Sequence, residues 1–273
     1  MLNKTSISIC GCGWLGFPLG IHLANEGHEV KGSTRSAQKL NALYQKGIQP
    51  FLLEVHKKVK GTNLSQFFQS EILIINIPPG RRRKDVARAH PNQIVALIEK
   101  AVAYNIQKIL FISSTSVYGN VNRLVTEADE PRPETPSGAA LVTAENLLLG
   151  NTAFKTTILR MGGLVGLGRP AGRFQEGRKG VKNGQAPVNM VHQEDCIRII
   201  RKIIELDQWG QIYNVCADEH PIKHDFYTHQ AYQKGFEPPT FLMEEDYEFK
   251  KVSNYKLKKE LGYQFLHPDP MGF

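Results

Sequence analysis

The chain is poor in cysteine and has no long apolar run. The cysteines show no metal-ligand spacing and two of them fall in a glycine-rich turn, so we expect reduced thiols and no metal site; they are Cys10, Cys12, Cys196 and Cys216. No apolar run approaches the roughly 18 residues of a membrane-spanning helix, and Met1 to Ser6 lacks the pattern of a signal peptide. We therefore expect a soluble, cytoplasmic protein with no membrane partner.

An excess of one charge sign raises the question of nucleic-acid binding. The formal net charge is +8 over 273 residues, with basic patches at 81–84 and 250–259. The C-terminal lysines alternate with Val252, Tyr255 and Leu257 at helical spacing, which is typical of a solvated helix face. The segment Arg81-Arg82-Arg83-Lys84 follows an apolar strand, so it is either a solvated loop or a loop that meets an anionic ligand. We expect no nucleic-acid partner.

Near the N-terminus a short predicted strand runs into G-x-G-x-x-G and then a helical pattern. In this arrangement Gly11 permits a tight turn, Gly13 lets the backbone approach a pyrophosphate, and Gly16 lets the helix pack closely on the strand. The first N–H groups of the helix would bind the phosphates. A glycine-rich turn without a ligand is the alternative, but the strand, helix and second strand around the motif favour a bound dinucleotide.

The end of the second strand indicates which dinucleotide binds. Sites for NAD usually place Asp or Glu there, about 20 residues after the first glycines. This chain has Ser33, Thr34 and Arg35 instead, and Arg forms strong charge-assisted bonds with phosphate. We therefore predict NADP(H), with NAD as the alternative and a merely solvated Arg35 as the competing interpretation. The predicted cofactor-binding residues are Gly11, Gly13, Trp14, Leu15, Gly16, Ser33, Thr34, Arg35, Asn76 and Pro78.

Strand and helix patterns alternate through the first part of the chain. Such alternation predicts parallel pairing, hence an α/β fold with a Rossmann-type doubly wound parallel sheet. The predicted strands are 6–10, 28–33, 51–55, 72–77, 108–113 and 156–160, and the predicted helices are 14–26, 37–46, 64–68, 92–104 and 140–149.

Beyond Arg160 the chain becomes rich in glycine, which predicts a long irregular region. A helix at 194–206 and a strand at 212–215 follow, and the last 55 or so residues contain several prolines. We expect a dinucleotide-binding domain at 1–165, completed by 189–217, and a small C-terminal substrate lobe formed by 166–188 and 218–273.

Three further segments resemble the short-chain dehydrogenase/reductase superfamily in its extended, epimerase/dehydratase-like form. They are Phe111–Gly119, similar to the strand end that carries the catalytic Ser or Thr of that family; Leu159–Arg169, similar to the segment that leads into its substrate loop; and Asn189–Asp195, similar to "N-x-VH-x-xD". The resemblance spans nearly the whole chain and implies the fold predicted above.

The chain departs from that family at its catalytic pair, Tyr-x-x-x-Lys. Aligning on Ala144-Glu145 places Ser137 at the Tyr position and Leu141 at the Lys position. Leucine neither binds a ribose nor lowers a pKa, and serine is a poor proton donor without an activating base. This loss resembles an atypical subgroup of the family.

The remaining candidates for chemistry are few. The resemblance implies a catalytic role for Ser114, which would hold a substrate hydroxyl or carbonyl, and Tyr118 is the nearest phenol that could replace the missing acid. His192 could act as a base or a substrate contact, and three arginines of the glycine-rich region could bind an anionic substrate group: Arg160, Arg169 and Arg173. We predict an NADP(H)-dependent epimerase/dehydratase or oxidoreductase acting on a sugar-like or carbonyl small molecule, with a homodimer as a candidate assembly. A catalytically silent NADP(H)-binding regulatory protein is the alternative.

Overall fold

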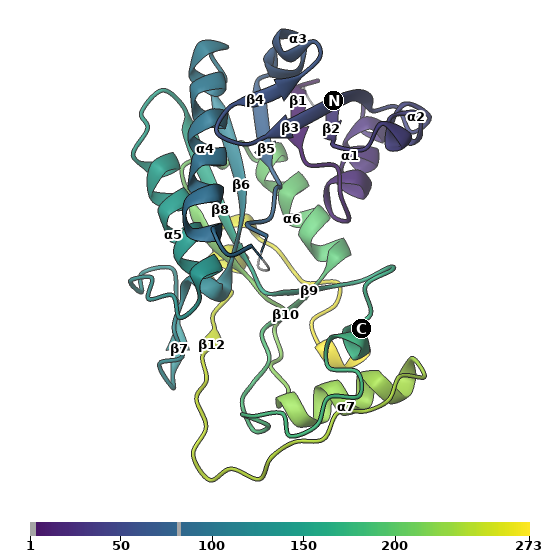
Figure 1. Ribbon diagram of the computed structural model, residues 1–273, viewed down its shortest axis with the longest axis vertical. Coiled ribbons are helices and arrows are strands. Elements are labelled where there is room, and N and C mark those ends of the chain that lie inside the picture. Colours follow the sequence, from purple (N-terminus) through teal and green to yellow (C-terminus); the bar gives the residue numbers. More distant parts are fainter. Residues whose placement is uncertain (1–3, 81–82) are drawn as a thin grey trace. The chain divides into compact units, whose positions relative to one another are not determined.

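The computed structural model describes residues 4–80 and 83–273 (Figure 1). Arg81 and Arg82, half of the predicted basic loop, lie outside the described residues. The chain divides into two compact units. Unit 1 comprises Met1–Val117, Pro133–Leu159 and Arg201–Ile212, and unit 2 comprises Tyr118–Arg132, Arg160–Ile200 and Tyr213–Phe273. Across the described residues, no helix is both long enough and apolar enough to cross a bilayer.

The main sheet contains eight strands among the described residues, in the order β11-β8-β6-β5-β1-β2-β3-β4. Its pairs from β3 through β2, β1 and β5 to β6 are parallel, and the edge pair β3–β4 is antiparallel. The strands are β1 (Ser6–Cys10), β2 (Glu29–Thr34), β3 (Gln49–Val55), β4 (Val59–Gly61), β5 (Ile72–Ile75), β6 (Lys108–Ser114), β8 (Lys155–Met161) and β11 (Ile212–Val215).

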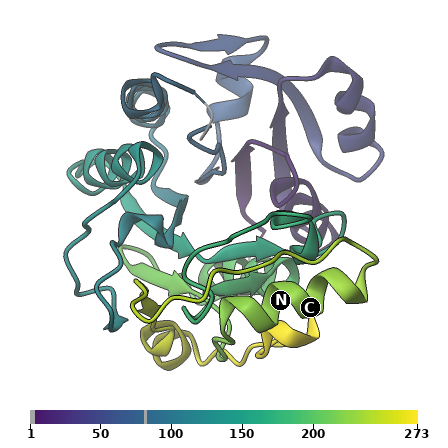
Figure 2. The same ribbon diagram turned by 60° about the horizontal axis from the view of Figure 1, so that its bottom comes forward.

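Helices cover both faces of this sheet. In unit 1, α4 and α5 lie side by side on one face and α1 lies on the other (Figures 1 and 2). Helices between successive parallel strands give the doubly wound Rossmann arrangement that the sequence predicts. The helices as far as Glu205 are α1 (Gly16–Asn25), α2 (Leu40–Tyr44), α3 (Leu64–Phe68), α4 (Val86–Ala103), α5 (Pro136–Leu149) and α6 (Gln193–Glu205), with short 3-10 turns η1 (Ala37–Lys39) and η2 (Thr115–Val117).

The central strands are apolar because both of their faces are covered. Ile9 in β1 lies between Gly32 of β2 and Ile74 of β5 in the register of the sheet. Ile9, Leu73 and Ile74 are fully buried, as expected for a parallel sheet with helices on both sides. The sheet order reverses at β1, and in such sheets ligands bind beyond the carboxyl ends of the strands at this point.

Three predicted helices begin at other residues, and the fifth, predicted from Ala140, starts at Pro136. The first helix starts at Gly16 rather than near Trp14, with Pro18 in its first turn as predicted. The fourth starts at Val86 rather than near Asn92 and contains Pro91. A proline removes one helical hydrogen bond, but burial of Val86 and His90 anchors the turns before it. Tertiary packing therefore outweighs the local preference of Pro91.

Further short elements escaped prediction. The predicted helix at 37–46 is the turn η1 followed by the single short helix α2. The chain after β3 turns back as β4, and the irregular region after Arg160 contains a parallel pair, β9 (Gly163–Val165) with β10 (Met190–His192). A second small pair joins β7 (Leu124–Val125) to β12 (Lys251–Val252). Strands of two or three residues carry too few side chains to show a period in the sequence.

Unit 2 has its own apolar cluster. It includes Val165, Met190 and Phe226, with Phe241 and Phe273 packed against it. The remaining helical elements of this unit are η3 (Ala171–Phe174), α7 (Lys223–Gln233), α8 (Tyr255–Leu261) and η4 (Pro270–Gly272). Apolar side chains thus hold the end of the C-terminal segment on the unit. The predicted small lobe and its boundaries stay a prediction.

Candidate cofactor site

A cavity of about 430 Å³ opens at the carboxyl ends of β1, β2 and β5, entirely within unit 1. Its position matches the crevice expected where the order of a doubly wound sheet reverses. The lining residues are Cys10, Gly11, Cys12, Gly13, Ser33, Thr34, Arg35, Ser36, Lys39, Leu53, Val55, Asn76, Ile77, Pro78, Pro79, Gly80, Arg83 and Gln93.

The glycines after β1 differ in what surrounds them. Gly11 has a φ of +106°, and a Cβ there would lie 2.6 Å from the Asn76 carbonyl oxygen. A Cβ on Gly16 would lie under 3.0 Å from the Gly11 carbonyl oxygen, so the helix start requires glycine as well. A Cβ on Gly13 would meet nothing within 4 Å, although Gly13 lines the cavity. The open space at Gly13 is where a pyrophosphate would approach the backbone, so this turn fits a dinucleotide.

Hydrogen bonds hold the turn in shape. The Gly11 N–H donates to Ser33 Oγ at 3.0 Å and the Cys12 N–H donates to the Ser33 carbonyl oxygen at 2.8 Å. The Asn76 side-chain amide donates to the Gly11 carbonyl oxygen at 2.9 Å. Ser33 and Asn76 thus fix the end of β1 from both neighbouring strands, besides lining the cavity.

The charges that line the cavity are all positive. Arg35, Lys39 and Arg83 contribute cations, and none of the lining residues in the described chain is Asp or Glu. Arg83 is paired with Asp85 at 3.0 Å, whereas Arg35 and Lys39 are exposed at the end of β2 and in η1. Burial raises the pKa of both Cys10 and Cys12 to about 12, so neither thiol adds negative charge at neutral pH. The cavity is suited to an anionic ligand.

Seven of the ten predicted cofactor residues line this cavity; Trp14, Leu15 and Gly16 do not. Lys39 and Gln93 were missed. Lys39 lies in η1, and the extended backbone at Ser36 separates it from Arg35, so no helical spacing in the sequence links these two side chains. Gln93 reaches the cavity from α4 and donates to the Val55 carbonyl oxygen at 2.7 Å; nothing local in the sequence predicts that contact.

Comparison with known proteins confirms the resemblance seen in the motifs. The profile of the "NAD dependent epimerase/dehydratase family" matches residues 9–216. The chain belongs to this family. Its match begins in β1 and includes every residue that lines the cavity.

Individual relatives agree with this assignment. The chain is 35% identical to Protein YeeZ of Escherichia coli (strain K12) over 268 residues, which cover 97% of each chain. This match confirms the resemblance to an atypical subgroup of the family, here a YeeZ-like one. The structure of a functionally unknown conserved protein from Silicibacter pomeroyi DSS is similar with a TM-score of 0.80 and 21% identity, covering 98% of this chain and 96% of that one.

A structure with ligands shows the same fold. UDP-glucuronic acid 4-epimerase from Bacillus cereus, solved in complex with UDP-glucuronic acid and NAD, has a TM-score of 0.79 and 20% identity to this chain. The superposition covers 98% of this chain and 96% of the epimerase chain. At that identity the likeness establishes the fold alone.

In this epimerase/dehydratase family member, α5 carries the two residues that the sequence predicts in place of the usual catalytic pair. Ser137 is 9% exposed and Leu141 is 3% exposed. Thr135 caps the helix by accepting from the Gly138 N–H at 3.1 Å. One turn further along, the buried Glu145 accepts from Ser113 Oγ at 2.5 Å. This face of α5 therefore serves packing and a buried polar contact to β6.

Ser114, the predicted catalytic serine, is the last residue of β6. Its side chain is half-buried, and its hydroxyl accepts from the Ser116 N–H at 3.1 Å. Since β6 pairs with β5, whose end leads to Asn76 in the cavity, Ser114 lies at the same carboxyl edge of the sheet in unit 1.

Tyr118 belongs to unit 2 and its hydroxyl is fully engaged. It is 2% exposed, accepts from Arg160 Nη1 at 2.7 Å and donates to Asn214 Oδ1 at 2.9 Å. Arg160 also lies over the Tyr118 ring, 4.9 Å from its centroid. Burial raises the pKa of Tyr118, although Arg160 opposes that rise. The hydroxyl thus accepts from a buried guanidinium and donates to a buried amide oxygen.

The other predicted substrate residues also lie in unit 2. Arg169 and Arg173 are exposed, the first over the ring of Phe174 at 5.5 Å and the second over Phe236 at 5.3 Å. His192 ends β10 and is half-buried; burial, followed by the proximity of His267, lowers its pKa. His192 therefore remains neutral at physiological pH.

Proposed function

We propose that this protein binds NADP(H) in the unit 1 cavity and uses it in redox chemistry on a small carbonyl or sugar-like molecule. The observation that carries the proposal is the cavity lining, which combines the glycine turn with Arg35 and Lys39 and contains no acidic residue among the described positions. An acidic side chain would hold the ribose 2′-OH of NAD and repel a 2′-phosphate, whereas two cations attract one.

The residues of the chain divide the task of holding such a cofactor. Gly11 and Gly13 admit the pyrophosphate to the backbone, and Arg35 with Lys39 binds the 2′-phosphate. A bound nicotinamide would supply hydride transfer. Ser114, at the same edge of the sheet, would hold a substrate oxygen by its hydroxyl, the role that the family pattern implies.

A second candidate is a catalytically silent NADP(H)-binding regulatory protein. The burial of Ser137 and Leu141 favours it, because neither residue can replace the tyrosine and lysine that usually activate the substrate. Both candidates share the cofactor site and differ in turnover. Tight binding of NADPH without its oxidation by any carbonyl substrate in a broad screen would identify the regulatory protein.

The test is a titration of the purified protein with NADPH and with NADH, followed by nicotinamide fluorescence at two salt concentrations. We expect tighter binding of NADPH and a preference that weakens at the higher salt concentration, because a 2′-phosphate is recognised by charge. Equal binding, or tighter binding of NADH, would contradict the NADP(H) assignment.

Arg35→Ala is expected to weaken NADPH binding by about 10- to 100-fold and to leave NADH binding within about twofold, because it removes charge-assisted bonds of about 1.5–3 kcal/mol to the 2′-phosphate. Lys46→Ala is the matched control, since Lys46 is an exposed cation of unit 1 that does not line the cavity. If both variants weaken NADPH equally, the effect comes from overall charge and the role of Arg35 is refuted.

We further propose that Tyr118 positions Arg160 instead of donating a proton. Tyr118→Phe should then lower the free energy of unfolding by about 1–3 kcal/mol, because a buried guanidinium and the Asn214 amide each lose a partner. The activity of the folded fraction, measured on a substrate that the screen identifies, should stay within about twofold. A loss of activity of about 100-fold at unchanged stability would instead restore Tyr118 as the replacement acid.

A further inference from the structure

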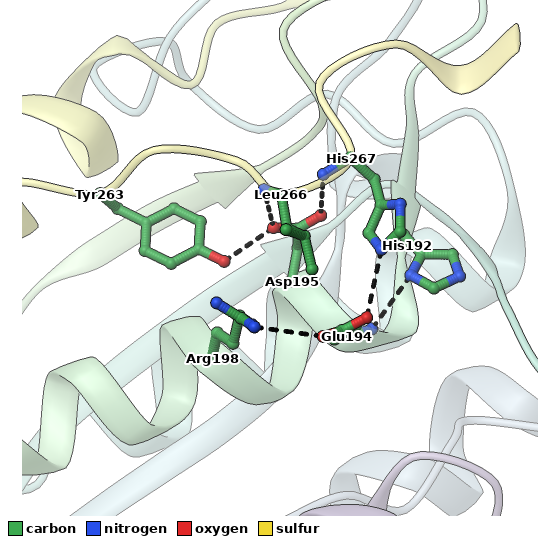
Figure 3. A network of polar contacts seen from close by, with 7 residues as sticks. All are labelled: His192, Glu194, Asp195, Arg198, Tyr263, Leu266 and His267. Atoms are coloured by element: carbon green, nitrogen blue, oxygen red, sulfur yellow. Dashed lines mark hydrogen bonds and ion pairs between the residues drawn. The ribbon is translucent and has the colours of Figure 1, made fainter. Parts of the chain in front are cut away.

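Far from the glycine motif in sequence, unit 2 brings two histidines and a glutamate together (Figure 3). His192 ends β10, Glu194 lies in the first turn of α6, and His267 belongs to the segment between α8 and η4. Each side chain offers one ligand atom, and these atoms lie within 4.8 Å of one another. His267 Nε2 is 3.2 Å from Glu194 Oε2, and the two imidazole rings have centroids 3.9 Å apart.

The cluster is held by a buried carboxylate. Asp195, which is fully buried, accepts from the His267 N–H at 3.1 Å, the Leu266 N–H at 2.8 Å and the Tyr263 hydroxyl at 2.7 Å (Figure 3). Asp195 therefore fixes the backbone of His267 directly beside Glu194. Metal ligands are typically oriented by such secondary contacts.

The donor set and its geometry suit a divalent cation. Zinc binds imidazole nitrogen at about 2.0–2.1 Å and carboxylate oxygen at about 2.0–2.2 Å, so its ligand atoms lie roughly 3–4 Å apart. The His267–Glu194 pair already has that separation, and His192 needs a rotation of its half-buried ring. Glu194 presents its other oxygen to Arg198 at 3.3 Å, which leaves Oε2 for the cluster.

We propose that His192, Glu194 and His267 form a binding site for a zinc-class divalent cation. Two imidazoles and one carboxylate match the three-ligand zinc sites that keep a coordination position open to water. The ion ties the C-terminal segment to the β10–α6 junction and gives unit 2 a Lewis-acidic position. This site does not depend on the proposed NADP(H) function, and it revises the expectation, based on cysteine spacing alone, that the chain binds no metal.

The test is equilibrium dialysis of the chelator-treated full chain against ZnCl₂, with CoCl₂ as a spectroscopic probe. We expect one equivalent of Zn²⁺ and a visible Co²⁺ spectrum characteristic of nitrogen and oxygen ligands. His192→Ala, His267→Ala and the isosteric Glu194→Gln should each weaken Zn²⁺ binding by about 100-fold or more, while circular dichroism shows that they remain folded. Because Glu194→Gln keeps the shape of the side chain, a loss of Zn²⁺ binding in this variant would come from the missing carboxylate and not from misfolding.

His224→Ala is the matched control. His224 is an exposed histidine of α7 whose Nδ1 lies 2.8 Å from Asp225 Oδ1, a His–carboxylate pair outside the cluster. The His224→Ala variant should bind Zn²⁺ with the same stoichiometry and affinity as the unaltered protein. Absence of stoichiometric Zn²⁺ and Co²⁺ binding, or an equal loss in His224→Ala and His267→Ala, would overturn the site and leave the cluster as a set of hydrogen bonds.

Discussion

Gly16→Ala is expected to lower the free energy of unfolding by about 3 kcal/mol and to eliminate measurable NADPH binding. The Cβ would lie under 3.0 Å from the backbone oxygen of Gly11 and 2.9 Å from the Asn76 side-chain amide. Backbone cannot yield as a flexible side chain does, so either α1 moves away from β1 or the Gly11 turn opens. Both changes distort the surface that would face the pyrophosphate. Urea denaturation and NADPH fluorescence titration measure the two effects.

Gly13→Ala provides the matched comparison. The added methyl group meets no protein atom within 4 Å, and Gly13 does not have a positive φ, so stability should change by no more than about 0.5 kcal/mol. The same methyl group enters the space proposed for the pyrophosphate, and NADPH affinity should fall by about 10-fold or more. If Gly13→Ala binds NADPH normally, the phosphates do not lie against this turn.

The glycine turn could be predicted from sequence because its requirements are local. A strand, three glycines at fixed spacing and a helix specify one backbone path, and Gly11 and Gly16 occupy positions that no Cβ fits. The buried strands β5 and β6 were predictable for a similar reason. A strand covered by helices on both faces of the sheet has apolar side chains in succession, and both segments show such a run. Errors there concern only the ends of elements.

Contacts between distant residues could not be predicted in this way. The Ser113–Glu145 hydrogen bond joins a strand to a helix 32 residues later, and Glu194 meets His267 across 73 residues. His192 was recognised as a titratable residue, but its neighbours depend on how the C-terminal segment folds back. Likewise, Pro91 predicts a helix boundary locally, and only the burial of Val86 and His90 explains why α4 begins earlier.

The second large effect is expected at Asp195. Asp195→Ala should lower the free energy of unfolding by about 3–5 kcal/mol, because it leaves the Tyr263 hydroxyl and two backbone N–H groups without their acceptor. Burial, and then the bond to Asp195, raises the pKa of Tyr263, so the hydroxyl stays a neutral donor at physiological pH. The segment that carries His267 is held to α6 by this carboxylate, and its amides should lose protection from hydrogen exchange.

Asp195→Asn distinguishes the hydrogen bonds that Oδ1 accepts from the one that Oδ2 accepts. Its amide oxygen can still accept from Tyr263 and Leu266, as Oδ1 does, but its NH₂ group replaces the Oδ2 that accepts from the His267 N–H. The loss should therefore be smaller, about 1–3 kcal/mol, with faster hydrogen exchange concentrated at His267. Zinc affinity should also fall by about 10- to 100-fold, because His267 loses its orientation. If neither variant lowers the free energy of unfolding, the contacts of Asp195 do not hold the C-terminal segment, which is then held chiefly by the packing of Phe273 and its apolar neighbours.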